Sequence, residues 1–374
     1  MKILFVAGGT AGHVNPAIAT AEAMKKRHRD ASIVFVGRKG GEEMISVIKR
    51  GYKLRELCVG GLERRLSAKS VKSVYLALKA IGDAKRIIRE EKPDAVFATG
   101  GYVSWPVLKA AMNEGVPTVL HESNAYPGLV TRLMHKRVTR LLIGTDACKE
   151  HLKYPDRAIT VGTPLRDGFL GITKNEARRK LGISVGEILI VSFGGSLGSK
   201  AINDAVIEIM KSYSGKNSRI KHIHSAGKRY FDAIKSEERE LTEGRNGCII
   251  KPYIDDMPTY LIAADITVSR SGALSISELS AVGPAAILIP SPNVADDHQT
   301  KNAAALDKAG AAITVKESEL KSGALKKAVT ELVDDGIKRH LLSKNIKKLH
   351  RDDSSENVCR ILEDIINIKT SSAP

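Results

Sequence analysis

A short apolar run that ends in a glycine-rich turn occurs twice in this chain, and a helical pattern follows each copy. Residues 3–7 lead into GGTAG, and residues 188–193 lead into GGSLG. A continuous apolar run of this length is typical of a strand buried in a parallel sheet. The order strand, tight turn, helix is the building unit of α/β proteins. The repeat therefore predicts two similar Rossmann-like domains.

The length of the chain, 374 residues, is too great for one ordinary hydrophobic core. We place an N-terminal domain at residues 1–163, a second domain at 164–350, and a C-terminal helix and tail at 351–374 that packs back on the first domain. Asn15 and Pro16 are predicted to open the first helix, because Asn is a good N-cap and Pro suits the first helical position. The fold class is α/β. Further strands are expected at residues 32–37, 54–59, 94–99, 118–121, 140–144, 221–225, 248–253, 265–269, 286–290 and 312–315.

The stretch at residues 269–302 is the densest candidate site. A β-branched run ends at Ser-Arg-Ser-Gly, a helical pattern starts at Ala273, and a second apolar run ends before a polar loop that contains His298 and Gln299. Ligands of such sheets bind beyond the carboxyl ends of the strands, so residues 270–278 and this loop are expected to face one crevice. The first N–H groups of the helix suit a phosphate, and Glu278 can accept hydrogen bonds from vicinal hydroxyls. The stretch predicts a nucleotide-sugar pocket.

The two glycine turns allow a ligand to approach the backbone closely. Neither matches the dinucleotide fingerprint G-x-G-x-x-G, and neither ends in the Lys-Ser/Thr of a phosphate-binding P-loop. Each is either a structural turn or a phosphate site. The chain contains no Asp-x-Asp, the usual carboxylate pair that holds a divalent ion on a nucleotide diphosphate. We therefore expect no metal and no other cofactor. Arg and Ser side chains and helix termini are expected to stabilise the negative charge of the leaving group instead.

Several histidines and one polar run stand out as candidates for chemistry. His13, where the first turn becomes a helix, is either a structural hydrogen-bonding residue or a general base, since imidazole titrates near neutral pH. Residues 121–124, His-Glu-Ser-Asn, end a strand with four polar side chains, which favours a site. His222 and His224 share one face of a strand and are expected to be core histidines rather than metal ligands. Arg166 is either a surface residue or a ligand of a diphosphate.

The net charge of +17, from 59 Lys and Arg against 42 Asp and Glu, attracts the chain to polyanions. Aromatic residues make up only 4% and form no stacking platform, so nucleic acid is not an expected partner. Residues 66–89 form a basic amphipathic helical pattern that either covers a sheet or binds an anionic membrane surface. No apolar run reaches the roughly 18 residues of a membrane span. The four cysteines are spread singly, which fits a reducing cytoplasm.

Taken together, seven motifs resemble the MurG family of glycosyltransferases. They are GGTAGHVNPAIA, GGYVSWP, HESNAYPG, GTPLR, GGSLGSKAIN, DDMPTYLIAADITVSRSGALSISEL and PSPNVADDHQTKNA, in order along the chain. The resemblance implies a GT-B fold, two Rossmann-like domains with parallel sheets facing a central cleft. It also implies inverting transfer of GlcNAc from UDP-GlcNAc to the C4 hydroxyl of undecaprenyl-diphosphate-MurNAc-pentapeptide, lipid I, without an obligatory metal. Peripheral attachment to the cytoplasmic face of the cell membrane, an anionic surface, is implied as well.

The resemblance also implies roles for individual residues. His13 is the first candidate for the general base and Glu122 the second. The acceptor diphosphate is expected at His13, Gly100, Gly101 and Tyr102. The expected contacts of UDP-GlcNAc are Thr10, Ala11, Gly12, Asn124, Arg166, Ser196, Ile254, Ala273, Leu274, Ser275, Ile276, Ser277, Glu278 and Gln299.

Three other functions remain open at this point. A UDP-GlcNAc 2-epimerase would keep the pocket but need no lipid acceptor. Another GT-B glycosyltransferase would use a different lipid. A non-enzymatic polyanion binder would rest on the charge of +17 alone.

Overall fold

The computed structural model describes residues 1–59, 68–169, 171–195, 197–213, 219–234 and 247–371. The chain forms two compact units, one of Met1–Arg166 with Arg351–Pro374 and one of Asp167–His350. Each is an α/β unit around one parallel sheet, and every strand pairing described is parallel. The two parallel-sheet Rossmann-like domains predicted from the repeated turn are confirmed. The central cleft between them stays a prediction.

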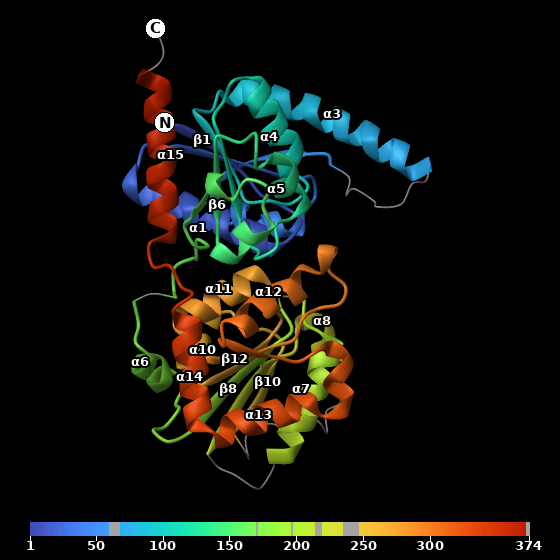
Figure 1. The fold of residues 1–374 in the computed structure, drawn as a ribbon, viewed down its shortest axis with the longest axis vertical. Coiled ribbons are helices and arrows are strands. Elements are labelled where there is room, and N and C mark those ends of the chain that lie inside the picture. Colours follow the sequence, from blue (N-terminus) through green and yellow to red (C-terminus); the bar gives the residue numbers. More distant parts are fainter. Residues whose placement is uncertain (60–67, 170, 196, 214–218, 235–246, 372–374) are drawn as a thin grey trace. The chain divides into compact units, whose positions relative to one another are not determined.

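The N-terminal unit has a seven-stranded sheet with the order β3-β2-β1-β4-β5-β6-β7 (Figure 1). Its strands are β1 Lys2–Val6, β2 Ser32–Arg38, β3 Lys53–Leu57, β4 Ala95–Ala98, β5 Thr118–Glu122, β6 Arg140–Ile143 and β7 Ala158–Thr160. Its helices are α1 Ala11–Arg27, α2 Ile45–Ile48, α3 Ala68–Glu91, α4 Ser104–Asn113, α5 Leu129–Met134 and α15 Ser354–Ser371, with 3-10 turns η1 Glu42–Met44, η2 Asp146–His151 and η3 Pro155–Arg157.

Both faces of this sheet are buried, which explains why its strands are continuous apolar runs rather than alternating ones. Leu4 and Val6 of β1 pack into the core under α3 and α4, whereas Ile3 and Phe5 pack into the core under α1 and α15. Phe5 stacks on Phe35 of β2, with ring centroids 5.4 Å apart. The alternation of side chains along one strand thus supplies two cores.

The C-terminal helix α15 lies along α1, although the two are far apart in sequence (Figure 1). Cys359 and Leu362 of α15 are fully buried in the core that α1 shares. At the rim, the guanidinium of Arg27 donates to Glu363 at 2.7 and 2.8 Å and to Glu356 at 2.8 Å. Hydrophobic burial and these charged bonds together hold α15 on the N-terminal unit.

The first helix begins at Ala11 and not at Asn15, so the predicted start is wrong. Thr10 has the extended backbone of an N-cap, and the N–H groups of His13 and Val14 donate to its carbonyl. Pro16 therefore lies inside α1, where it cannot donate to the carbonyl of residue 12. A further difference is β7, which is absent from the predicted strands because it has only three residues at a sheet edge.

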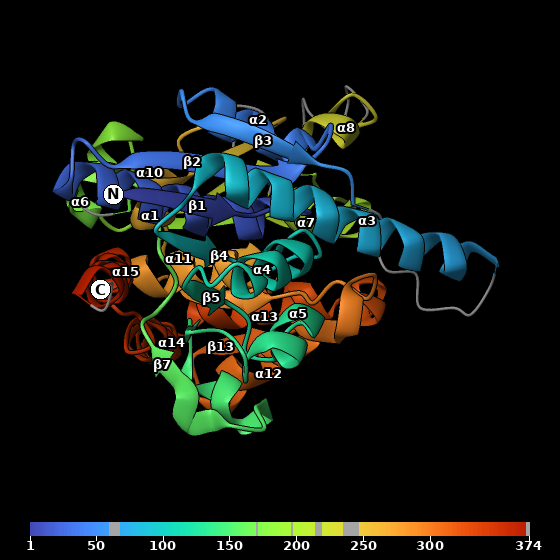
Figure 2. The same cartoon turned by 90° about the horizontal axis from the view of Figure 1, so that it is seen from above.

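The helix α3 runs beside α4 (Figure 2). Its described side chains from residue 78 onward show a face that covers the sheet, with Ala84 and Ile88 buried. Lys85 and Arg89 form ion pairs with Glu114. Residues 78–89 of the predicted amphipathic pattern thus form a helix that covers the sheet. Residues 66 and 67 lie outside the described residues, and the membrane role stays a prediction.

The second unit has a six-stranded sheet with the order β10-β9-β8-β11-β12-β13. Its strands are β8 Ile188–Phe193, β9 Ile220–Ser225, β10 Cys248–Lys251, β11 Ile266–Ser269, β12 Ala285–Leu288 and β13 Ala312–Thr314. Its helices are α6 Lys174–Lys180, α7 Lys200–Tyr213, α8 Lys228–Phe231, α10 Met257–Ala263, α11 Ala273–Val282, α12 His298–Lys308, α13 Ala324–Asp334 and α14 Gly336–Lys347, with 3-10 turns η4 Ala295–Asp297 and η5 Glu317–Ser322.

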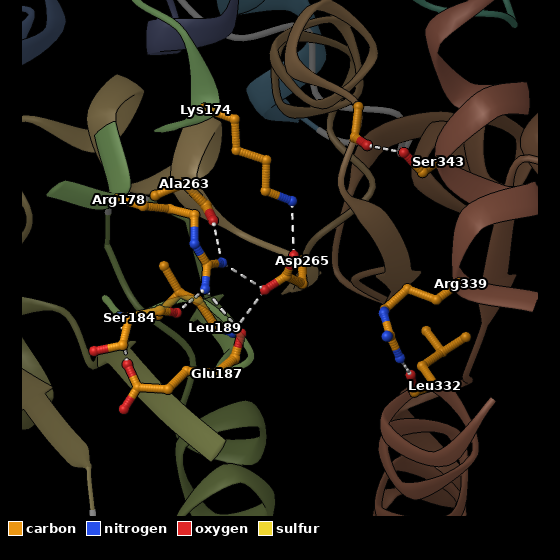
Figure 3. A network of polar contacts seen from close by, with 11 residues as sticks. Lys174, Arg178, Ser184, Glu187, Leu189, Ala263, Asp265, Leu332, Arg339 and Ser343 are labelled. Carbon is orange, nitrogen blue, oxygen red and sulfur yellow. Dashed lines mark hydrogen bonds and ion pairs between the residues drawn. The ribbon is translucent and has the colours of Figure 1, made fainter. Parts of the chain in front are cut away.

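A charged network at the amino-terminal edge of this sheet holds α6 in place (Figure 3). The carboxylate of Asp265 accepts bonds from Lys174 Nζ at 2.7 Å, from Arg178 Nη1 at 2.8 Å and from the N–H of Leu189 at 2.9 Å. Burial raises the pKa of Asp265, but the two cations and the backbone bond outweigh it, so the pKa lies below its ordinary value. The network is structural, because ligands of such folds bind at the opposite, carboxyl edge.

No helix within the described ranges is long and apolar enough to cross a membrane.

Candidate functional site

In the N-terminal unit, His13 packs directly on the glycine pair that follows β4. A Cβ on Gly100 would lie 3.2 Å from the His13 ring, and a Cβ on Gly101 would lie 2.4 Å from the carbonyl oxygen of Gly8. Both glycines have positive φ angles, +94° and +77°. Thr99 Oγ1 donates to the carbonyl of His13 at 2.7 Å. The sequence motif GGY is thus explained by the close approach of two turns that only glycine permits.

The hydrogen bond of the His13 ring determines which nitrogen can act as a base. Nδ1 lies 3.2 Å from the carbonyl oxygen of Gly8 and 3.4 Å from Thr10 Oγ1, a hydroxyl oxygen that can accept as well as donate. A carbonyl only accepts, so this bond requires the proton on Nδ1. The neutral ring then keeps its lone pair on Nε2. His13 is half-buried in the first turn of α1, and its Nε2 meets the chemical requirement of a general base.

The turn between β1 and α1 presents backbone groups rather than side-chain caps. Thr10 is the N-cap of α1 without a side-chain capping bond, and Ala11 and Gly12 are the first helical residues. The first turn of α1 contains no acidic residue. A Cβ on Gly9 would lie 3.3 Å from Tyr102, whose hydroxyl accepts a bond from Arg38 at 3.4 Å. The uncapped N–H groups of this turn are suited to an anionic oxygen.

Glu122, the second candidate base, is engaged by its own loop. Its Oε1 accepts from the N–H of Asn124 at 3.0 Å and from Asn124 Nδ2 at 2.9 Å. Its Oε2 accepts from the N–H of Gly128 at 2.8 Å and from Thr131 Oγ1 at 2.7 Å. A buried carboxylate with four donors is satisfied without a substrate. The geometry favours a role for Glu122 in holding the loop that carries Asn124, over a role as base.

His121 holds the segment that follows β7 and leads to Arg166. This fully buried ring lies with Nε2 2.8 Å from the carbonyl oxygen of Gly162, and burial lowers its pKa. A Cβ on Gly162 would lie 2.2 Å from Ser354 Oγ, so the chain here also touches the first residue of α15. His121 is therefore a positioning residue for the segment that leads to Arg166. Arg166 itself is half-buried and is the last residue of the unit before the second one begins.

In the second unit, the glycine turns after β8 and β9 contact each other through their backbones. A Cβ on Gly198 would lie 2.2 Å from the carbonyl oxygen of Ala226, and a Cβ on Gly227 would lie 2.6 Å from the Cα of Gly198. A Cβ on Gly194 would lie 2.4 Å from the N of Ser199. The turn is therefore as tight as the GGSLG motif predicts. Its Ser196 lies outside the described residues, and its contact with a donor stays a prediction.

Arg270 is a residue whose role the sequence did not reveal. Its guanidinium donates to the carbonyl oxygens of Ile289 and Pro290 at 3.3 and 3.2 Å and to Ser199 Oγ at 2.7 Å, and it pairs with Glu317. The side chain is only 13% exposed. It ties the loops after β8, β12 and β13 together, and its expected place at the crevice stays a prediction. The partners come from distant parts of the sequence, which is why no local motif signals this role.

The helix α11 begins with backbone groups that no side chain caps. Its N-cap is Gly272, and its first turn contains no acidic residue. Ser277 Oγ donates back to the carbonyl of Ala273 at 2.9 Å, so that hydroxyl serves the helix. Glu278 is 7% exposed in the second turn. The first N–H groups and the positive dipole end at residues 273–275 are suited to a phosphate, as predicted for this helix.

Gln299 lies at the start of α12 and is oriented by backbone bonds. Its Oε1 accepts from the N–H of Ser291 at 2.9 Å, and its carbonyl accepts from Ser271 Oγ at 2.9 Å. The Nε2 amino group is therefore the end of the side chain available to donate to a sugar hydroxyl. Asp296 and Asp297, just before it, have φ angles of +54° and +51°. Non-glycine residues with positive φ are strained and cluster at binding loops.

The predicted site residues thus form one group in each unit. Thr10 to His13, Gly100 to Tyr102, Glu122 and Asn124 lie at the carboxyl ends of β1, β4 and β5. The stretch Ala273 to Glu278 and Gln299 follow β11 and β12, and Ile254 follows β10 with its side chain 3% exposed. Within the described residues, no group of three His, Cys, Asp or Glu side chains is arranged to hold a metal ion.

Comparison with known proteins identifies relatives over nearly the whole chain. The model of the glycosyltransferase family 28 N-terminal domain matches residues 3–143, and that of the family 28 C-terminal domain matches residues 189–358. A UDP-N-acetylglucosamine--N-acetylmuramyl-(pentapeptide) pyrophosphoryl-undecaprenol N-acetylglucosamine transferase of Caldicellulosiruptor saccharolyticus is 36% identical over 98% of this chain and 99% of its own length. An enzyme of the same name from Acetivibrio thermocellus is 36% identical over 99% and 100%.

Solved structures share the fold. The crystal structure of Acinetobacter baumannii MurG superposes with a TM-score of 0.76 at 24% identity, covering 97% of this chain and 99% of that one. The UDP-GlcNAc 2-epimerase of Neisseria meningitidis, bound to UDP-GlcNAc, reaches 0.67 at 15% identity, covering 97% and 100%. The architecture is thus that of GT-B proteins. Because both family 28 models match and relatives of one name are 36% identical over nearly full length, this chain belongs to glycosyltransferase family 28 and, within it, to the MurG family.

Proposed function

We propose that this protein transfers GlcNAc from UDP-GlcNAc to the C4 hydroxyl of undecaprenyl-diphosphate-MurNAc-pentapeptide, converting lipid I to lipid II in peptidoglycan synthesis. The observation that carries the proposal is the 36% identity, over 98% of the chain, to a relative named for this transfer. The match extends through both units, so it includes the strand ends at which the candidate residues gather.

His13 is the general base in this proposal. Its Nε2 takes the proton of the acceptor C4 hydroxyl while that oxygen forms a bond to C1 of GlcNAc. The bond between C1 and the diphosphate oxygen breaks on the opposite face, and UDP leaves with the electron pair. Attack opposite the leaving group inverts C1 and gives a β linkage. The bond from His13 Nδ1 to the Gly8 carbonyl supports this assignment, because it fixes the tautomer that has its lone pair on Nε2.

The second unit binds the donor in this proposal. The first N–H groups of α11, with Ser196, stabilise the negative charge that develops on UDP, and so does Arg166, the residue just before the second unit begins. Glu278 accepts hydrogen bonds from the ribose hydroxyls, and Gln299 Nε2 donates to the sugar. The backbone at Ile254 lies along the uracil. The absence of a side-chain cap on α11 supports its part in this arrangement.

The N-terminal unit binds the acceptor and the membrane in this proposal. The turns at Gly100, Gly101 and Tyr102 receive the acceptor diphosphate. The protein is attached peripherally to the cytoplasmic face of the cell membrane, since its substrate is a lipid and its net charge of +17 attracts anionic headgroups.

A UDP-GlcNAc 2-epimerase is the second candidate function. It is supported by fold likeness alone, because the epimerase of Neisseria meningitidis is 15% identical and that of Listeria monocytogenes 14%. Folds of this kind host many reactions, so a likeness at this level does not carry an activity.

Labelled UDP-GlcNAc, incubated with the full chain and a lipid I analogue in detergent micelles, tests the two functions side by side. We expect a labelled disaccharide lipid with a β anomeric linkage, and UDP release that depends on the acceptor. A parallel reaction without acceptor detects epimerisation to UDP-ManNAc. If the protein binds UDP by calorimetry and makes the epimer but no disaccharide, the transferase proposal is wrong.

A further inference from the structure

The two histidines of β9 belong to a fully buried polar cluster beneath the glycine turn of the second unit. The cluster consists of Ser192 on β8, His222 and His224 on β9, and Asn203 on α7. None of these side chains is more than 3% exposed. Ser192 Oγ lies 2.8 Å from His222 Nε2 and 2.8 Å from His224 Nδ1, and His224 Nε2 lies 3.0 Å from Asn203 Oδ1. A polar group this deep in a core is costly unless every bond is made in the right direction.

The cluster is joined to the backbone through Asn203. Asn203 Nδ2 donates to the carbonyl oxygen of Ala226 at 2.9 Å, which places Asn203 Oδ1 3.0 Å from His224 Nε2. On the other side of the ring, His224 Nδ1 lies 2.8 Å from Ser192 Oγ and 3.1 Å from the Ser192 carbonyl oxygen. Ser192 Oγ in turn lies 2.8 Å from His222 Nε2. The four side chains are thus linked by hydrogen bonds to the carbonyl of Ala226, and bonds in such a chain strengthen one another.

Both imidazoles are neutral in this cluster. Burial lowers the pKa of His224 to about 4, although the Ser192 carbonyl raises it slightly. Burial and the neighbouring His224 lower the pKa of His222 to about 3.

The cluster ends at the atom that contacts the glycine turn. The carbonyl oxygen of Ala226, which Asn203 holds, is 2.2 Å from where a Cβ on Gly198 would lie. The N–H of Ala226 donates to the carbonyl of Lys251 at 2.9 Å, so Ala226 is held through both its N–H and its carbonyl. Asn203 also donates its own N–H to the carbonyl of Ser199, the residue after the turn. A shift of Ala226 therefore has to move the backbone of the turn, because there is no space between them.

We propose that Ser192, Asn203, His222 and His224 are positioning residues that set the location of Gly194, Gly195 and Gly198 in the turn after β8, and thereby the affinity for the diphosphate of the donor. The inference rests on the proposed binding of UDP-GlcNAc to this unit. It assigns to the buried histidines an effect on donor binding, in place of a role in core packing alone.

The test compares Asn203→Asp with Ile202→Val. The first keeps the size of the side chain but replaces the donor to Ala226 by a carboxylate oxygen, and the second removes one methylene from the neighbouring fully buried residue on α7. For Asn203→Asp we expect the Kd of UDP by calorimetry, and the KM for UDP-GlcNAc, to rise about tenfold. This is the effect expected if the displaced turn loses one hydrogen bond to the charged diphosphate. The KM for the lipid acceptor and kcat should change less than about twofold to threefold, and Ile202→Val should leave all three near the wild-type values.

A second variant covers the case that Asn203→Asp does not fold, as judged by circular dichroism. Ser192→Ala breaks the link between the two imidazoles without adding charge, and a smaller rise of about threefold in the UDP Kd is expected. The inference is overturned if the folded variants lower the melting temperature but leave UDP affinity within twofold of the control. It is also overturned if the donor and acceptor KM values rise together. Failure of the wild-type protein to transfer GlcNAc would instead refute the proposed function, since UDP binding is measured without acceptor.

Discussion

Alanine at Gly101 tests whether the close approach of two turns sets the geometry of His13. A Cβ there would lie 2.4 Å from the carbonyl oxygen of Gly8, about 1 Å inside ordinary contact, and Gly8 is the residue that accepts the bond from His13 Nδ1. The φ angle of +77° adds strain for any L side chain. Gly115 is a matched control, because its φ is +68° but a Cβ there would meet nothing within 4 Å.

The two effects can be separated in magnitude. Left-handed backbone strain costs about 1–2 kcal/mol at either position. Overlap with Gly8 adds about 1–3 kcal/mol at Gly101 only. Gly115→Ala should therefore lower the melting temperature by roughly 2–8 °C, and Gly101→Ala by a further 2–12 °C or so, at about 2–4 °C per kcal/mol for a unit of this size.

Turnover should separate the two variants more sharply than stability does. Displacing Gly8 by about 1 Å tilts the His13 ring, and a misplacement of this size costs on the order of a hundredfold in rate. We expect kcat to fall by about that factor for Gly101→Ala and to stay within about twofold for Gly115→Ala. Calorimetric melting and the labelled transfer assay, on purified full-length variants, give both quantities. Equal melting temperatures and equal kcat for the two variants would refute the reasoning.

Three further changes have specific expected outcomes. His13→Ala should lower kcat by about 10²- to 10⁴-fold with little change in the donor KM, whereas His28→Ala, just beyond the far end of α1, should leave both unchanged in the transfer assay. Glu278→Ala should raise the donor KM about tenfold and affect kcat less, and the reverse pattern would contradict the assigned roles of Glu278 and His13. Asp265→Asn should lower the free energy of unfolding at pH 7 by about 2–4 kcal/mol in a urea titration, because it leaves the buried Arg178 without its carboxylate. Since the folded pKa of Asp265 lies below the unfolded value of about 3.9, this stabilisation is complete above that value and is lost as the pH falls through the lower folded pKa, so the gap between wild type and variant should close in acid.

Strands were predicted closely because burial on both sheet faces makes each one a continuous apolar run. The run at residues 188–193 coincides with β8, and the one at 118–121 is β5 without its last residue. Helix ends were harder to predict. Gly283 ends α11 in the left-handed conformation that favours glycine, whereas Thr10 was not recognised as the start of α1. The Asn-Pro pair that follows gave a stronger local signal than an N-cap without a side-chain bond.

The candidate residues came from the sequence, and the structure shows which contacts each of them makes. Glu122 looks like a base by residue type, yet four donors from residues 124–131 engage it. Arg270 stands in the Ser-Arg-Ser-Gly run before α11, yet its partners lie at Ser199, Pro290 and Glu317. A carboxylate or guanidinium has the same local signature whether its partner is a ligand or another part of the chain, so only the folded contacts distinguish the two.

The sequence by itself determined two parallel-sheet units, the turns at their strand ends and the family of the chain, because strand periodicity, glycine turns and motifs are local properties. The tertiary structure alone decided which nitrogen of His13 carries the proton. It also decided that His222 and His224 are linked through Ser192 and Asn203 to the carbonyl of Ala226. Both results depend on which groups the folded backbone brings within hydrogen-bonding distance of a ring nitrogen. For His13 that group is the carbonyl of Gly8 in its own turn, and for His224 it is the amide of Asn203, 21 residues away in the sequence.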